Sequence, residues 1–198
     1  ASSVAVYGRP DKLPVEETNQ LFPIYSYGIA KKCAEEYIRF FGDNYGLNFT
    51  ILRYGNVYGP RQPIYGEVGV IAIYADRVAK REPLTVFGDG GDMRDYIYVD
   101  DVVDVTLQTV QEGDWETFNV SSGVGTPVSS LFDIFNRLCG GSLTRVHQPA
   151  RIGELGSFSA SSEKAKRLLN WRASVSLEQG IKATIDDYDV VRTARQNP

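Results

Sequence analysis

The chain has 198 residues, of which 42% are hydrophobic and 23% charged, a composition typical of one globular domain or a little more. A net charge of −4 without a Lys/Arg cluster excludes nucleic acid as an expected partner, and no segment reaches the ~20 apolar residues that cross a bilayer. Cys33 and Cys139 lie far apart without CxxC spacing, so we expect no disulfide framework, no metal site and a cytoplasmic protein.

The first part of the chain predicts a strand, a helix and a second strand. SSVAV at 2–6 has the character of a buried strand. Residues 24–46 place apolar side chains close to a 3.6-residue period and predict a long helix. LNFTILRY at 47–54 is rich in β-branched and aromatic residues and predicts a buried strand, which the loop GNVYGPRQP follows.

The remainder alternates between the two periodicities. Thr126 is expected to cap the helix that Pro127 begins. Helices are predicted at 67–81, 100–111, 127–138, 161–171 and 176–192, and strands at 84–87, 95–99, 116–122 and 143–148. This alternation predicts an α/β chain with a mixed sheet.

Tyr27 and Lys31 are the first pair with chemical meaning. Four residues apart on one predicted helix, their side chains emerge on the same face one turn apart. A phenol is a poor base at neutral pH, but an ammonium fixed beside it favours the phenolate. The pair therefore suits proton abstraction from an alcohol, although a simple helix-surface pair has the same spacing.

Six segments in order give this pair a context: SSVAVYG, YSYGIAKKCAEEY, ILRYGNVYGPRQ, EPLTVFGDGGDMRDYIYVDDVV, ARIGE and SEKAKRLLNWRASVSLEQGI. Together they cover most of the chain. Their pattern resembles the extended short-chain dehydrogenase/reductase family, in particular its NAD-dependent sugar-nucleotide epimerases and dehydratases.

The resemblance implies the C-terminal part of a Rossmann-type doubly wound sheet plus a smaller mixed α/β substrate-binding domain. Residues 1–66 would be the remainder of the NAD-binding domain, and 67–198 mostly the nucleotide-sugar domain, with a strand and helix at about 93–112 returning to the first. The family's glycine-rich turn between strand and helix does not occur in this sequence. We therefore expect the C-terminal portion of the family, with the front of the cofactor domain missing.

The resemblance also implies a reaction. Tyr27 is the expected catalytic base, Lys31 orients it and holds the cofactor ribose, and Ser3 hydrogen-bonds the substrate hydroxyl. Tyr27, Lys31 and Tyr54 are the expected cofactor contacts, with NAD as the cofactor and NADP left open. The sugar would be oxidised to a 4-keto intermediate and reduced on its other face, epimerising C4.

Further positions match the family's contacts to the nucleotide sugar, which we expect to be UDP-linked. Arginine suits the diphosphate because its planar fork meets phosphate oxygens in pairs. The expected substrate contacts are Asn56, Gly69, Val70, Phe87, Arg94, Arg151, Glu154 and Phe158.

Three positions bear on the choice of reaction and sugar. Val4 and Ala5 stand where related dehydratases carry an Asp-Glu pair, which disfavours elimination. A bulky Phe158 opposite the sugar's C2 substituent favours UDP-glucose and UDP-galactose, unless it is simply a packed aromatic.

The alternatives to a 4-epimerase are a related 4-oxidoreductase or dehydratase, or a non-catalytic fragment that retains nucleotide-sugar binding or a subunit contact. By the same resemblance a homodimer is expected through the helix at about 27–46.

Overall fold

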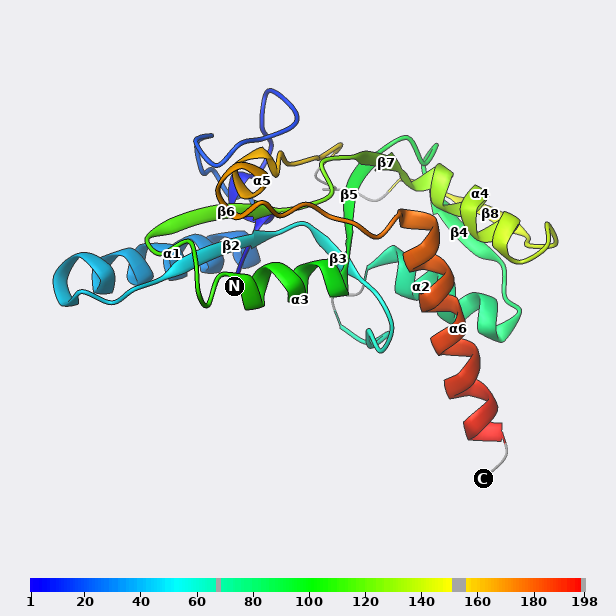
Figure 1. The fold of residues 1–198 in the computed structure, drawn as a ribbon. Helices are drawn as coiled ribbons and strands as arrows, with labels where there is room; N and C mark the ends of the chain where they lie inside the picture. The colour runs from blue at the N-terminus through cyan, green and yellow to red at the C-terminus, as the bar shows by residue number, and fades with distance from the viewer. Residues whose placement is uncertain (67–68, 151–155, 197–198) are drawn as a thin grey trace.

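A parallel sheet with helices against it forms one region of the protein. The computed structural model describes residues 1–66, 69–150 and 156–196. Strands β1 (Ser2–Ser3), β2 (Thr50–Tyr54) and β6 (Glu116–Val120) pair in the order β1-β2-β6. Helix α1 (Ser26–Tyr45) contacts β1, and α5 (Glu163–Leu169) contacts β6 (Figure 1). This is the arrangement of a doubly wound α/β fold.

A second region groups helices with a small parallel sheet. β4 (Leu84–Phe87) pairs with β8 (Arg145–Gln148). Helices α2 (Val70–Lys80), α4 (Val128–Leu138) and α6 (Leu177–Gln196) lie near this sheet, and α6 ends at the far tip of the molecule (Figure 1). α2 packs on α6 and also contacts β4.

Strand β5 (Met93–Tyr98) runs between the two regions (Figure 1). Its first half pairs antiparallel with β7 (Gly125–Pro127), and its second half pairs parallel with β3 (Asn56–Tyr58). Helix α3 (Val99–Gln108) follows directly and contacts β3 and β5. The residues of the predicted return at about 93–112 form β5 and α3, and β6, beyond that range, pairs with β2 in the first region. The division into two domains stays a prediction.

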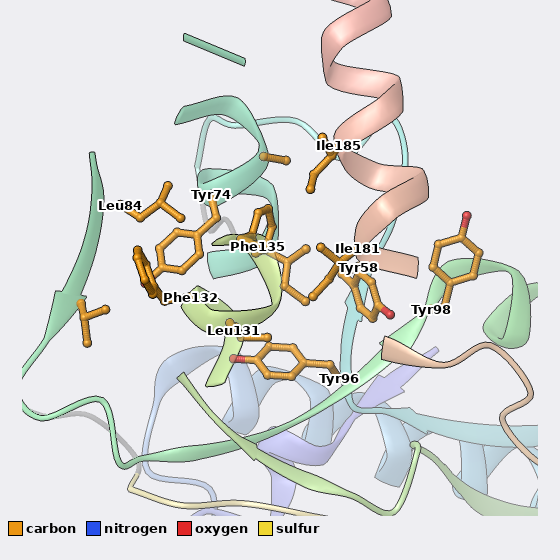
Figure 2. Close-up of a cluster of buried hydrophobic side chains, with 13 residues drawn as sticks. Tyr58, Tyr74, Leu84, Tyr96, Tyr98, Leu131, Phe132, Phe135, Ile181 and Ile185 are labelled. Carbon is orange, nitrogen blue, oxygen red and sulfur yellow. The ribbon is translucent and has the colours of Figure 1, made fainter. Parts of the chain in front are cut away.

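Each region has its own apolar core. Aromatic side chains dominate the larger core, where the rings of Tyr74 and Phe135 meet edge to face at 5.5 Å between centroids (Figure 2). The second core lies between the parallel sheet, α3 and α5, and includes Phe118 and Trp171. A third, small cluster contains Tyr7 and Phe158. In the part of the chain that the structure describes, no helix is long and apolar enough to span a membrane.

Two local predictions are wrong. SSVAV forms a strand only at Ser2–Ser3, because the chain then turns into a 3-10 helix, η1 (Val4–Tyr7). Thr126 does not cap α4. It pairs with Arg94 in β7, and Pro127 occupies the cap position without a side-chain hydrogen bond. Sheet pairing competed with the local capping preference and prevailed at Thr126.

Candidate active site

Ser3 and Tyr54 lie at the carboxyl ends of two neighbouring parallel strands, where they pair with each other. Ser3 Oγ accepts a hydrogen bond from the backbone N of Ala5 at 3.2 Å and so caps η1. The hydroxyl of Tyr54 lies 3.0 Å from Thr106 Oγ1 on α3. In doubly wound folds ligands bind outside the carboxyl ends of the strands, so this edge is suited to a cofactor or substrate.

The first turns of α1 carry Tyr27 and Lys31 to the same place. Lys31 Nζ donates to the carbonyl of Ala1 at 3.2 Å and lies 5.7 Å from the centroid of the Tyr27 ring. Tyr27 is 45% exposed and accessible to a ligand. A Cβ on Gly28 would stand 2.5 Å from the carbonyl oxygen of Ala5, so the helix backbone packs directly on η1. The three predicted catalytic residues therefore come from elements in contact with one another.

A cleft of about 880 Å³ lies among β3, β4, β5 and α2, within the size range of small-molecule sites. Asn56, Gly69, Val70, Phe87 and Arg94 line it, and each of them is a predicted substrate contact. They come from three strands and one helix start that are far apart in the sequence. The structure thus brings together five of the eight predicted substrate contacts.

Arg94 and Asn56 supply fixed polar groups to this cleft. Arg94 Nη1 donates to the carbonyls of Met93, at 2.9 Å, and Gly156, at 2.5 Å, while Nη2 lies 4.0 Å from the Asp92 carboxylate. Asn56 Nδ2 donates to the carbonyl of Asp95 at 3.0 Å. A guanidinium held by backbone carbonyls is oriented before a ligand arrives, which favours a phosphate partner.

The GDGGD turn forms part of the wall. Gly88 and Gly90 have φ values of 59° and 72°, in the left-handed region that glycine tolerates. A Cβ on Gly90 would also meet Val86 Cγ1 at 2.8 Å. The turn therefore presents backbone rather than side chains to the cleft at these two positions.

The cleft is also lined by residues that the sequence did not indicate, among them Tyr25, Tyr74, Arg77, Tyr96 and Gln148. Burial raises the pKa of Tyr74 to about 12, and its hydroxyl donates to the carbonyl of Thr85 at 2.8 Å. Helical or strand periodicity assigns such aromatics to a core, and only the tertiary fold shows that they also border a cavity. Tyr25 could have been found from the sequence, because it stands two residues before Tyr27. It links the head of α1 to the cleft.

Phe158 does not line the cleft. It is 6% exposed, stacks on Tyr7 at 6.4 Å between ring centroids, and its backbone N donates to the carbonyl of Met93 at 3.0 Å. Phe158 is therefore a packed aromatic, the alternative that the sequence left open. Its role toward a sugar stays a prediction.

Two other predicted substrate contacts, Arg151 and Glu154, lie outside the described residues. Among the described residues, no group of His, Cys, Asp and Glu could hold a metal ion.

A family model described as the NAD dependent epimerase/dehydratase family matches residues 1–121. The chain belongs to this family. The match lies in the N-terminal part of this chain and does not bear out the prediction that it corresponds to the family's C-terminal portion. The chain spans about 60% of the length of the curated relatives it matches.

Three solved structures illustrate the similarity. UDP-glucose 4-epimerase from Thermotoga maritima, with UDP-glucose, is 43% identical with a TM-score of 0.92, over 96% of this chain and 62% of that one. UDP-glucose 4-epimerase from Thermus thermophilus, in complex with NAD, is 34% identical with a TM-score of 0.86, over 94% and 62%. UDP-N-acetylglucosamine 4-epimerase from Methanobrevibacter ruminantium, in complex with UDP-N-acetylmuramic acid, is 25% identical with a TM-score of 0.91, over 96% and 62%. The predicted α/β class with a Rossmann-type parallel sheet is confirmed.

Proposed function

We propose that the protein catalyses NAD-dependent epimerisation of a UDP-linked sugar at C4, with UDP-glucose and UDP-galactose as the substrate pair. The observation that carries the proposal is the junction at Tyr25, which lines the cleft two residues before Tyr27. A nucleotide sugar held in the cleft would extend its sugar toward the exposed Tyr27. The three similar epimerases, which act on UDP-linked sugars, support this choice of substrate class.

The roles of the residues follow from their positions. Tyr27 takes the proton of the sugar's 4-hydroxyl, Lys31 supports the phenolate one turn away, and Ser3 hydrogen-bonds the same hydroxyl. Arg94 binds the diphosphate in the cleft. Bound NAD would supply reversible oxidation at C4. Tyr54, Tyr27 and Lys31, beside the carboxyl edge of a parallel sheet, fit the nicotinamide and ribose end of that cofactor.

The choice between epimerisation and dehydration depends on the residues that directly follow Ser3. η1 contains only Val4, Ala5, Val6 and Tyr7, so this turn offers no carboxylate for the acid and base that elimination of water requires. We therefore favour epimerisation over dehydration. Phe158 is packed on Tyr7 and does not line the cleft, so the choice of glucose and galactose over their N-acetylated counterparts is supported by the two similar UDP-glucose 4-epimerases.

We also propose a homodimer through α1. Large apolar side chains on this helix are exposed rather than buried: Ile29, Tyr37, Phe40, Phe41 and Tyr45. An apolar stripe of this kind on a helix marks an interface, and a two-fold dimer would cover it with the same stripe of a second copy.

The test compares Tyr27→Phe with Tyr65→Phe, a change of the same chemistry at an exposed position outside α1 and outside the cleft. Conversion of UDP-galactose to UDP-glucose by the NAD-loaded protein is measured for both. We expect Tyr27→Phe to lower kcat by about 10²–10⁴-fold, the usual contribution of a general base, and Tyr65→Phe to leave it unchanged. An unaltered kcat in Tyr27→Phe would show that another group takes the proton.

A further inference from the structure

A buried carboxylate lies on the same face of α1 as the proposed catalytic pair. Glu35 follows Tyr27 and Lys31 at intervals of four residues. It is 1% exposed, whereas the neighbouring Glu36 is exposed. The proposed reaction assigns no role to a carboxylate two turns further along the helix. The burial of Glu35 therefore needs another explanation.

Glu35 connects α1 to both strands that end in site residues. Its Oε1 accepts from Ser2 Oγ at 2.5 Å and from Arg53 Nε at 2.9 Å, and its Oε2 accepts from Arg53 Nη2 at 2.6 Å. Ser2 and Arg53 pair with each other across β1 and β2, and each directly precedes a predicted site residue, Ser3 and Tyr54. One carboxylate therefore fixes the helix relative to both strand ends.

The network extends beyond this pair. Arg53 Nη1 donates to the hydroxyl of Tyr7 at 2.8 Å, and that hydroxyl donates to Asn119 Oδ1 on β6 at 2.7 Å. The ring of Tyr7 in turn stacks on Phe158. The elements that carry Ser3, Tyr27, Lys31 and Tyr54 are thus joined through a single buried set of hydrogen bonds.

The electrostatics fit a pair that is ionised at neutral pH. Burial by itself would raise the pKa of the Glu35 carboxyl, but hydrogen bonds from Arg53 and Ser2 outweigh it and hold the pKa below its ordinary value. Burial would likewise lower the pKa of Arg53, and its bonds to Glu35 raise it instead. A charge pair with bidentate geometry and further satisfied partners has few alternative arrangements, which suits a fixed reference point.

We propose that Glu35, held by Ser2 and Arg53, is a positioning residue that sets the register of Tyr27 and Lys31 against Ser3. This inference rests on the proposed function. The contact of Lys31 with Ala1 lies one turn closer to the site, and a rotation or slide of α1 about the Glu35 anchor would displace it. Misplacement of a reacting group by about 1 Å can lower the rate of a reaction about 100-fold.

The experiment measures kcat and KM for UDP-galactose in the NAD-loaded protein, well below each variant's melting temperature. Glu35→Gln keeps the shape of the side chain but loses its charge, and Glu36→Gln is the matched control. We expect Glu35→Gln to lower kcat about 10–100-fold. KM should stay within about threefold, because every cleft residue except Tyr25, at the head of α1, lies on another element. Bound NAD is measured beside both. Glu36→Gln should match the wild type.

A second variant separates positioning from folding. Ser2→Ala leaves the Glu35–Arg53 pair intact and removes only its link to β1, so its melting temperature should stay close to that of the wild type while kcat still falls. An unchanged kcat in Ser2→Ala and Glu35→Gln, beside an active wild type, would overturn the inference alone. The inference would also be overturned if kcat and bound NAD fell and KM rose in parallel with the loss of folded protein. A wild type that epimerises no UDP-sugar would overturn the proposed function and this inference with it.

Discussion

Replacing Gly28 by Ala tests how tightly the head of α1 is held. At an exposed site in a helix this change stabilises, since glycine costs about 0.8–1.0 kcal/mol relative to alanine. Here the new Cβ would stand 2.5 Å from the carbonyl oxygen of Ala5 and 3.0 Å from Pro23 Cβ. The first contact is at least half an ångström closer than real Cβ atoms approach, and its partner is backbone, which cannot rotate away.

The sign of the effect follows from the competition between the two contributions. Overpacking costs about 1–3 kcal/mol, and a 2.5 Å contact with backbone places this one in the upper part of that range, at about 2–3 kcal/mol. Subtracting the gain in helix propensity of about 1 kcal/mol leaves an expected net loss of about 1–2 kcal/mol. For a chain of this length that lowers the melting temperature by about 2–8 °C. Because the clash adjoins Tyr27, we also expect kcat for UDP-galactose to fall about 10–100-fold.

Gly42→Ala on the same helix is the matched control. Its Cβ would meet side-chain atoms, Phe49 Cε1 at 2.5 Å and the Trp115 ring at 3.0 Å, about four turns from Tyr27. We expect a loss of stability with kcat within about twofold of the wild type. Thermal melts by circular dichroism and the epimerase assay measure both quantities. A Gly28→Ala protein that is more stable than the wild type and equally active would show that the contact between α1 and η1 has room for a side chain.

Two further predictions concern buried carboxylates. The pKa of Glu35 is lowered in the fold from an ordinary value of 4.5, so its contribution to stability is present above about pH 4.5 and is lost as the pH falls through the folded value. In urea titrations the stability gap between the wild type and Glu35→Gln should therefore be largest at neutral pH and shrink below pH 4.5, and a gap independent of pH would contradict this. The buried Asp101 accepts hydrogen bonds from the backbone N of Ser174 at 2.9 Å and from its Oγ at 2.8 Å, so Asp101→Asn should cost about 1–3 kcal/mol, whereas the exposed Asp100→Asn should be neutral; equal unfolding midpoints for the two variants would argue against that role.

Much of the secondary structure and the chemical motif were accessible from the sequence. The helical period of 24–46 predicted α1, the β-branched run ending at Tyr54 predicted β2, and the four-residue spacing placed Tyr27 and Lys31 on one face. These features depend on side chains close together in the chain, and local periodicity and residue type encode them directly. The five cleft contacts were named from motifs rather than from geometry, and the structure places them around one cavity.

Tertiary structure decided the rest. Thr126 has the local chemistry of a helix cap but pairs in β7, and SSVAV has the composition of a strand but turns after Ser3, because contacts made with distant residues outweigh preferences worth about a kilocalorie or less. The periodicity of the sequence does not indicate that Glu35 is buried against Arg53, or that Tyr74 and Tyr96 border the cleft as well as the core. Pairing of β1 with β2 brings Ser2 and Arg53 together against Glu35, and packing of α2 on β4 and α6 sets Tyr74; such non-local contacts exist only once the chain has folded.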